Sequence, residues 1–249
     1  MVSNNLMQDR LQELFPVHYR NGNILLINAD CIDVMKHIKD GEAELSCVDP
    51  PYGIGASGSF GHYWDSTSGK PAILGVNNIK KEWDNSIPDK KYFEELFRVS
   101  KNQIIWGGNY FTRYLPETRS WICYDKKQPE ANSFGKFELA WTSLDEIPNI
   151  FRYYPTHVTH GARIHPTQKP VALYKWLLSR YAKPGDRILD THGGSGSICI
   201  ACHDLGYDLT WMELDADYYK AACKRYQNNA SQGTLFDQAE LTRSNGWKA

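Results

Sequence analysis

The sequence has no long apolar segment and almost no net charge. No apolar run approaches the length of a membrane span, and residues 1–15 are polar and mixed, which is not typical of a signal peptide. The formal net charge is −1, so nucleic acid would have to be bound by local basic patches rather than by an overall field. These absences predict a cytoplasmic protein without a membrane partner.

The cysteines form neither a disulfide framework nor a complete zinc motif. Six cysteines lie at scattered spacings, which favours reduced thiols. Residues 199–203 match the Cys-x-x-Cys-His pattern of haem attachment, but they lie in a predicted helix and such short patterns arise by chance. There is no second cysteine pair for zinc, and His157, His160 and His165 lie among arginines and tyrosines. We therefore predict no metal site.

Strand-like and helix-like segments alternate along the chain, without an internal repeat or a clear domain boundary. The length of 249 residues suits one large α/β domain with a full core, and we predict a single domain over 1–249. The predicted strands are 23–28, 43–48, 104–106, 121–124, 137–141, 187–190 and 209–212. The predicted helices are 32–38, 89–100, 167–182, 197–205 and 215–228.

One predicted strand leads straight into Asp49-Pro50-Pro51-Tyr52. The two prolines fix the backbone and remove donors, so this turn is rigid. The Asp49 carboxylate and the Pro50 carbonyl can each accept one N–H of an exocyclic amine, while Tyr52 can stack on a flat ring. Taken alone, the motif would be interpreted as a plain proline turn. A second motif makes a binding site the better interpretation.

That second motif is a glycine-rich turn between a strand and a helix, at 189–197. Such a turn lets a ligand approach the backbone and presents free N–H groups at the helix start. Glu213 ends the following strand, where an acid can hold the two hydroxyls of a ribose. A dinucleotide site uses similar parts, but Cys199 replaces the third fingerprint glycine, and the Asp49 turn has no role in hydride transfer.

Together the motifs resemble those of DNA amino-methyltransferases, which use S-adenosylmethionine. Residues 49–52 resemble the catalytic motif of that family, residues 190–197 its cofactor loop, and residues 165–170 (His-Pro-Thr-Gln-Lys-Pro) a further signature. The resemblance runs from about 23 to 228. Because the catalytic motif precedes the cofactor motif, the chain resembles the permuted β class. Thr191-His192 stands where the family often has proline and an aromatic residue.

The resemblance implies a Rossmann-like, mostly parallel sheet of seven strands in circularly permuted order. It implies Asp49, Pro50 and Tyr52 as catalytic residues, and Asp30 beside the adenine of S-adenosylmethionine. Thr167, Gln168 and Lys169 would lie near its methionine carboxylate. The full set of expected cofactor-binding residues is Asp30, Cys31, Asp49, Thr167, Gln168, Lys169, Asp190, Thr191, Gly193, Gly194, Ser195, Gly196, Glu213 and Leu214.

The expected activity is methyl transfer to the N6 amine of adenine in DNA, as in restriction–modification. Accepting the two amine protons at Asp49 and Pro50 would free the nitrogen lone pair for in-line attack. The base must first leave the stack. Cytosine N4 is an alternative, although serine in place of Asp49 is more typical of that class. RNA or protein amide methylation more often has a leading asparagine, and a catalytically silent DNA-binding regulator would not need intact motifs.

Two irregular stretches adjoin the expected site. Residues 53–85 have no sustained periodicity, and since they follow the Asp49 turn we predict a mobile loop there. A small target-recognition segment is expected within about 112–163. It is short, which suggests a brief or relaxed recognition sequence.

The expected partners are DNA and, less directly supported, a second copy of the chain or a sliding clamp. Gln232, Leu235 and Phe236 resemble part of the short peptide by which bacterial replication proteins hold the clamp. Bound as an extended tail, it would place Leu235 and Phe236 in an apolar pocket. The simpler and favoured interpretation is that these two side chains pack back on the protein.

Overall fold

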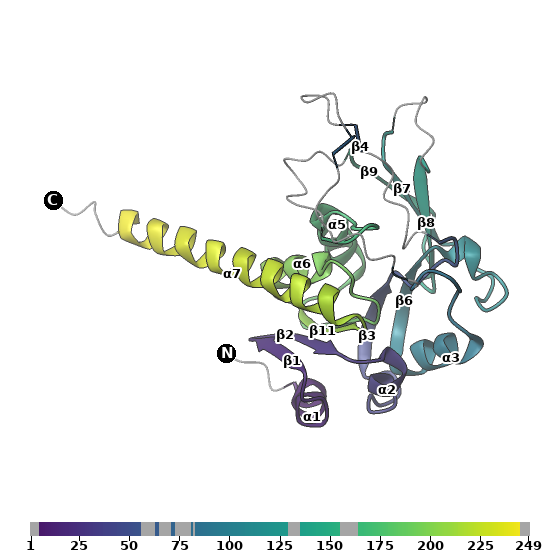
Figure 1. Cartoon of the computed structure of the whole chain (residues 1–249), viewed down its shortest axis with the longest axis horizontal. Coiled ribbons are helices and arrows are strands. Elements are labelled where there is room, and N and C mark those ends of the chain that lie inside the picture. The colour runs from purple at the N-terminus through teal and green to yellow at the C-terminus, as the bar shows by residue number, and fades with distance from the viewer. Residues whose placement is uncertain are drawn as a thin grey trace.

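A nine-stranded sheet forms the centre of the computed structural model, which describes residues 5–55, 63–64, 71–72, 81, 83–128, 135–154 and 164–244 (Figure 1). Its order is β1-β2-β11-β10-β3-β6-β8-β7-β9. The strands are β1 (His18–Asn21), β2 (Ile24–Asn28), β3 (Ala43–Val48), β6 (Ser100–Trp106), β7 (Trp121–Asp125), β8 (Phe137–Thr142), β9 (Asn149–Arg152), β10 (Arg187–Asp190) and β11 (Asp208–Glu213). A separate antiparallel pair is formed by β4 (Tyr63–Trp64) and β5 (Pro71–Ala72).

The five central strands, β2, β11, β10, β3 and β6, are parallel to one another. The last two strands in the chain, β10 and β11, insert between the first two central strands, β2 and β3. The sheet is therefore mostly parallel and permuted, as predicted. The predicted number of seven strands was wrong, because β1 and β9 extend the two edges. Both are short and only partly buried, so they carry little of the apolar pattern that identifies a strand.

Helices cover both faces of the sheet. They are α1 (Leu6–Leu14), α2 (Cys31–Met35), α3 (Lys90–Val99), α5 (Val171–Tyr181), α6 (Ser197–Leu205) and α7 (Ala216–Ser244), with a 3₁₀ turn, η2, at Gly108–Tyr110. Alternate residues of β2 face the two layers, with Leu26 toward α5, α6 and α7 and Leu25 toward α1, α2 and α3. Strands buried on both faces have apolar side chains at nearly every position, which is why the central strands were recognised from the sequence.

Several predicted boundaries were wrong. The helix predicted over 167–182 begins at Val171, after the N-cap residue Pro170. Helix α2 ends at Met35 and not at 38, and β6 begins at Ser100 and not at 104. The last helix does not end at 228 but continues to Ser244, and α7 projects away from the body of the protein (Figure 1). Residues 232–236 are therefore helical and not an extended tail, and the side chains of Leu235 and Phe236 lie outside the described residues. None of the described helices is both long and apolar enough to cross a membrane.

Gln8 fastens α1 to the sheet and provides a test of this packing. Its side chain is fully buried, and Nε2 donates to the carbonyl oxygens of Asn23 (3.0 Å) and Leu209 (2.8 Å). Gln8→Ala removes both hydrogen bonds, so we expect the free energy of unfolding to fall by about 2 kcal/mol, measured by urea denaturation. Glu13→Ala, at an exposed position of the same helix, is the control. Equal stability of the two variants would contradict this role.

Candidate active site

Four acidic residues meet at one edge of the sheet. Asp30 follows β2, Glu213 ends β11, Asp190 ends β10 and Asp49 follows β3. These strands are parallel neighbours, so their carboxyl ends lie side by side. In open α/β sheets, ligands bind in the crevice outside the carboxyl ends of the strands. This edge is therefore the candidate site.

The turn that carries Asp49 is held in place by Asp84, a residue far along the chain. Oδ1 of Asp84 accepts hydrogen bonds from the backbone N–H groups of Tyr52 (2.7 Å) and Gly53 (2.9 Å). Its carbonyl oxygen accepts a further one from the N–H of Gly55 (3.0 Å). Asp84 is 1% exposed, so this is an internal anchor. The prolines and Asp84 together fix the direction in which the turn points.

The carboxylate of Asp49 is bound by two donors. Tyr52 Oη donates to Oδ1 at 2.6 Å, and Lys169 Nζ donates to Oδ2. Burial raises the pKa of the Asp49 carboxyl, and the ammonium of Lys169 opposes that shift. Burial alone would lower the pKa of Lys169, whose side chain is 3% exposed, but Asp49 and Glu138 outweigh burial and raise it. The lysine is therefore protonated at neutral pH.

Glu138, on β8, is the second carboxylate on Lys169. The Lys169 Nζ lies 3.0 Å from Oε2 of Glu138, and the Nζ of Lys126 lies 2.5 Å from Oε1. Burial would raise the pKa of Glu138, but the two lysines outweigh burial and lower it to about 2. With Glu138 ionised, Asp49, Lys169, Glu138 and Lys126 alternate in charge and are neutral as a group. We call these four side chains the ion chain.

The ring of Tyr52 packs against the turn after β6. A Cβ at Gly107, whose φ is +70°, would lie 2.1 Å from Cε1 of Tyr52, so only glycine allows this approach. The ring of Tyr110 stacks on Tyr52, with centroids 4.9 Å apart and planes 14° apart, and Tyr110 is 42% exposed. An aromatic surface that reaches solvent therefore lies beside the Asp49 carboxylate.

The glycine-rich turn after β10 lies against β11. A Cβ at Gly193 would lie 1.7 Å from the ring of Trp211, so a side chain there would displace the turn. Gly194 and Gly196 have φ of +51° and +66°, and Gly196 is the N-cap of α6. The N–H of Gly193 donates to the Met212 carbonyl (2.8 Å). The space that a side chain at Gly193 would need is thus filled by Trp211, and glycine allows the turn to lie against β11.

Asp190 is buried at the start of this turn. It is 2% exposed, and burial raises the pKa of its carboxyl to about 8, with Asp49 and Glu213 contributing. Its Oδ1 accepts a hydrogen bond from the N–H of His192 (3.1 Å). Burial lowers the pKa of His192 to about 4, so this ring is neutral at pH 7. The hydroxyl of Thr191 bonds to Tyr92 Oη (2.8 Å) and is directed at the protein.

Glu213 supports the turn from the next strand. Its two carboxylate oxygens accept hydrogen bonds from the N–H groups of Gly194 and Asp215, each at 2.8 Å. Burial raises the pKa of Glu213, and these backbone donors oppose the shift. Each oxygen keeps a lone pair for a further donor. Leu214 follows with 68% of its surface exposed.

Asp30 and Cys31 lie at the same edge, beyond Glu213. Asp30 is the N-cap of α2, and its Oδ1 accepts from the N–H of Ile32 (2.8 Å) while the residue remains exposed. Burial, and then the charge of Asp30, raise the pKa of the Cys31 thiol to about 12. The thiol is therefore neutral and unreactive, and can only pack against a ligand.

The signature segment at 165–170 is tied to the glycine turn. The Ser197 Oγ donates to the carbonyl of Lys169 (2.7 Å) and lies 3.1 Å from the Oγ of Ser195, which is buried. Thr167 Oγ1 bonds to His165 Nδ1 (3.2 Å). Gln168 Oε1 accepts from the N–H at 164 (3.2 Å). Thr167 and Gln168 thus shape their own turn, while the Lys169 side chain reaches Asp49.

The end of the segment predicted as a mobile loop lies across the edge of the site. Lys81 Nζ is 2.6 Å from both oxygens of Asp215, and the ring of Trp83 packs on His165, with centroids 5.2 Å apart. The ring of His165 in turn contacts Tyr218 at 4.3 Å. The rest of the predicted loop, residues 56–62, 65–70, 73–80 and 82, lies outside the described residues apart from β4 and β5.

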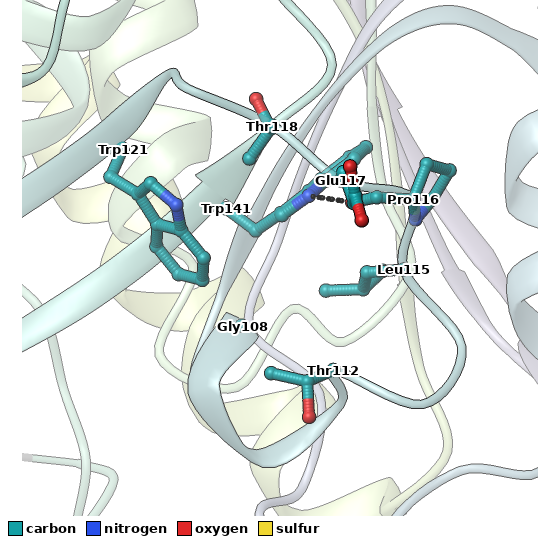
Figure 2. Close-up of a pocket in the computed structure, with 8 residues that line it drawn as sticks. All are labelled: Gly108, Thr112, Leu115, Pro116, Glu117, Thr118, Trp121 and Trp141. Atoms are coloured by element: carbon teal, nitrogen blue, oxygen red, sulfur yellow. Dashed lines mark hydrogen bonds between the residues drawn. The ribbon is translucent and has the colours of Figure 1, made fainter.

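A pocket of about 420 Å³ lies near the site but is not formed by the predicted site residues (Figure 2). It is bounded by the turn at Gly108 and by the rings of Trp121 and Trp141, and Nε1 of Trp141 donates to the Pro116 carbonyl (2.9 Å). Apart from Gly108, its lining residues lie within 112–163, the segment expected to carry target recognition. Residues 129–134 and 155–163 of that segment, with His157 and His160, lie outside the described residues.

The structure brings most of the predicted residues to one edge, and it adds three that the sequence did not reveal. Glu138 could have been noticed, because it is a lone charge in a predicted apolar strand, 137–141. Asp84 and Trp83 have no local signal, since their roles depend on how a long irregular stretch returns to the sheet. The placement of these residues is thus established, while the catalytic and cofactor-binding roles expected for each of them are still predictions.

Comparisons with known proteins agree with this arrangement. A family model for N6 and N4 methyltransferases, described as DNA methylase, matches residues 80–224. The type II methyltransferase M.HpaI of Haemophilus parainfluenzae is 22% identical over an alignment of 238 residues, which covers 80% of this chain and 73% of that protein.

Two solved structures share the fold. The M1.HpyAVI–SAM complex has a TM-score of 0.53 at 18% identity, covering 81% of this chain and 99% of that one. The PvuII DNA methyltransferase (cytosine-N4-specific) has a TM-score of 0.57 at 11% identity, covering 87% of this chain and 94% of that one. At these identities the likeness shows the fold alone.

The buried carboxyl of Asp190 predicts a pH-dependent stability. Between its ordinary pKa of 3.8 and about 8, the unfolded chain loses this proton while the folded chain keeps it, so folding becomes less favourable as pH rises. Asp190→Asn removes this effect. Relative to the parent chain, the variant should gain up to about 1.4 kcal/mol of stability per pH unit in this range. Urea denaturation from pH 5 to pH 8 measures the difference.

The matched control is Asp33→Asn, because that side chain is 63% exposed. Its stability difference from the parent should stay constant above pH 5. A difference for Asp190→Asn that also stays constant with pH would contradict the buried, protonated carboxyl.

Proposed function

This chain belongs to the DNA methylase family of N6 and N4 methyltransferases, and from that premise we propose that it methylates the N6 amine of adenine in DNA. The methyl donor is S-adenosylmethionine. The single observation that carries the proposal is Asp49, held at the carboxyl end of β3 beside an aromatic surface and next to the glycine turn. A leading aspartate in this motif is typical of adenine enzymes, whereas cytosine-N4 enzymes more often have serine.

The residues at the sheet edge fit the proposed cofactor. The turn after β10 ends at the start of α6, whose N-terminal N–H groups can face a ligand at this edge. Glu213 has free lone pairs for the two ribose hydroxyls, and the exposed Asp30 can accept from the adenine amine. The backbone of Lys169 adjoins the glycine turn, where the carboxylate end would lie, while its ammonium is bound to Asp49 and Glu138. When bound, the cofactor supplies an electrophilic methyl group.

Asp49 and Pro50 are proposed to accept the two protons of the target amine. The adenine amine is a poor nucleophile because its lone pair is delocalised into the ring, and two acceptors favour the geometry that frees it. The ammonium of Lys169 next to Asp49 opposes full protonation of the carboxylate. Asp49 is therefore better suited to stabilise positive charge that develops on the amine than to remove a proton outright.

Tyr52 is proposed to stack on the extruded base. Its hydroxyl is fixed by Asp49, and its ring packs closely on Gly107 and is stacked by Tyr110, so the ring is already oriented before the base arrives. A base outside the duplex loses stacking with its neighbours, and an aromatic ring at the site replaces part of that loss. We propose that the recognition of neighbouring bases lies within 112–163, where the Trp121–Trp141 pocket lies.

A second copy of the chain and a sliding clamp are the further candidate partners, and packing of Leu235 and Phe236 on the protein is still the favoured interpretation. The clamp would be held through Gln232, Leu235 and Phe236. Because residues 232–236 are helical, this contact would require the end of α7 to unwind. A peptide of residues 230–238 titrated against the clamp tests that requirement.

The direct test of the reaction is product identification. Unmodified plasmid DNA is incubated with the protein and S-adenosylmethionine labelled in the methyl group, then digested to nucleosides. The proposal expects label in N6-methyldeoxyadenosine. Label in N4-methyldeoxycytidine would overturn the adenine assignment, and no label in DNA would overturn the activity.

Asp49→Ala tests the acceptor. We expect the transfer rate to fall by on the order of 100-fold or more, because the developing positive charge on the amine loses its acceptor. Affinity for S-adenosylmethionine, measured by calorimetry, should change little, since the proposed ribose and adenine contacts remain. Asp33→Ala, an exposed aspartate on α2, serves as control. Turnover of Asp49→Ala close to that of the control would remove Asp49 from the mechanism.

A further inference from the structure

The ion chain leads from the buried catalytic edge to the surface at the hairpin of β7 and β8. Its inner members, Asp49 (15%) and Lys169 (3%), are less exposed than its outer members, Glu138 (23%) and Lys126 (25%). Lys126 follows directly after β7, and its N–H donates to the Lys136 carbonyl just before β8 (2.9 Å). Figure 1 shows this hairpin rising beside α5. A change at the loop end of the hairpin can therefore reach Asp49 through three successive ion pairs.

Three lysines lie together at the loop end of this hairpin, where β7 and β8 pass into the segment that connects them. They are Lys126, Lys127 and Lys136, and we call them the hairpin lysines. Lys127 and Lys136 are exposed, and within the described part of the chain neither has an ion pair closer than 4.0 Å. Lysines on a projecting hairpin beside a DNA-modifying site are suited to bind backbone phosphates, whose negative charge dominates the affinity for DNA.

Two ammonium groups, those of Lys126 and Lys169, contact Glu138, and their competition for this carboxylate determines the position of the Lys169 side chain. Lys126 holds Oε1 at 2.5 Å, while Lys169 lies farther, at 3.0 Å from Oε2, and donates its closer bond to Asp49. If Lys126 leaves for a phosphate, Glu138 attracts Lys169 alone. The contact between Lys169 and Asp49 then weakens, because one ammonium divides its charge between two carboxylates.

That shift would favour the proposed reaction. A cation against Asp49 competes with the target amine for the carboxylate and repels the positive charge that develops during transfer. Moving Lys169 toward Glu138 by a fraction of an ångström reduces both effects. Asp49 would then be available to the target amine only when DNA is bound at the hairpin.

We infer that Lys126 is a positioning residue that couples phosphate binding at the hairpin lysines to release of Asp49 by Lys169. This inference rests on the proposed function, because its substrate is DNA. Lys127 and Lys136 bind phosphate without touching Glu138, so they contribute to affinity and not to the coupling. Glu138 is the element that draws Lys169 away once Lys126 has moved.

Other groups around Asp49 do not move with Lys126. Tyr52 Oη bonds to its other oxygen, Asp190 adds a carboxyl from β10, and Cys47, Tyr92 and Tyr174 are buried with pKa values raised above their ordinary values by burial. These groups are present in the parent chain and in every hairpin variant. A difference between variants in the titration of Asp49 therefore reports the position of Lys169.

The first measurement is the salt dependence of KM for DNA. Lys126→Gln, Lys127→Gln and Lys136→Gln should each reduce the slope of log KM against log salt by about 0.9, the loss of one phosphate contact. Glu138→Gln should leave the slope unchanged and lower kcat instead. Unchanged slopes in all three lysine variants would contradict the proposal that the hairpin lysines bind DNA phosphates.

The second measurement separates the coupling from affinity. The acid limb of kcat/KM reports Asp49 in the free enzyme, and the acid limb of kcat reports it in the complex. In Lys126→Gln, Lys169 is drawn to Glu138 even without DNA, so the pKa of Asp49 in the free enzyme rises. The acid limb of kcat/KM should move to higher pH while that of kcat stays. Lys127→Gln should move neither, and Lys126→Arg should behave as the parent.

The product assay distinguishes a failure of the proposed function from a failure of this inference. No label in DNA for the parent chain would overturn both the proposed function and this inference. Label in DNA together with identical acid limbs for Lys126→Gln and Lys127→Gln would overturn the coupling alone. Circular dichroism of each variant confirms that the chain is folded before the comparison is made.

Discussion

The arrangement of the active edge depends on one buried lysine between two carboxylates. Lys169 is 3% exposed and contacts both Asp49 and Glu138. A carboxylate removed from water tends to take up a proton, and a neutral Asp49 would lose the negative charge that the proposed reaction needs. The ammonium of Lys169 opposes this protonation of Asp49 at a position where little water is present to do so. The same ion pair competes with a target amine for Asp49. The site must therefore balance the ionisation of Asp49 against its availability to the amine.

The parallel register of the sheet explains why these groups meet at all. β10 and β11 are the last strands of the chain, yet they insert between β2 and β3, which are among the first. All four carboxyl ends therefore reach one edge, and each supplies one acid. Short backbone-to-side-chain bonds, such as those from Gly194 and Asp215 to Glu213, then fix the turns relative to one another. Segments from the two ends of a circularly permuted chain thus form one continuous edge of the sheet.

The sequence was sufficient for the central strands and for the two motifs, because both are local patterns. Apolar runs with strand propensity mark β2, β3, β10 and β11, and the turns at 49–52 and 189–197 have distinctive prolines and glycines. The edge strands β1 and β9 were missed because half-exposed strands carry no such pattern.

Long-range contacts could not be predicted in this way. Asp84 anchors the Asp49 turn from the far end of an irregular stretch, and Glu138 reaches Lys169 from the other half of the sheet. The helix predicted from residue 167 begins only at Val171, because the segment before it is tied to the glycine turn by the hydrogen bond from Ser197 to the Lys169 carbonyl. Tertiary contact decided each of these positions.

The most direct test of the account is a crystal structure of this protein with S-adenosylhomocysteine, the demethylated form of the proposed cofactor. The account predicts the ribose hydroxyls on Glu213, the adenine beside Asp30, and the sulfur at the opening between the glycine turn and Asp49. Lys169 should remain within reach of both Asp49 and Glu138. A ligand bound elsewhere, for example in the Trp121–Trp141 pocket, would contradict the assignment of the sheet edge as the active site.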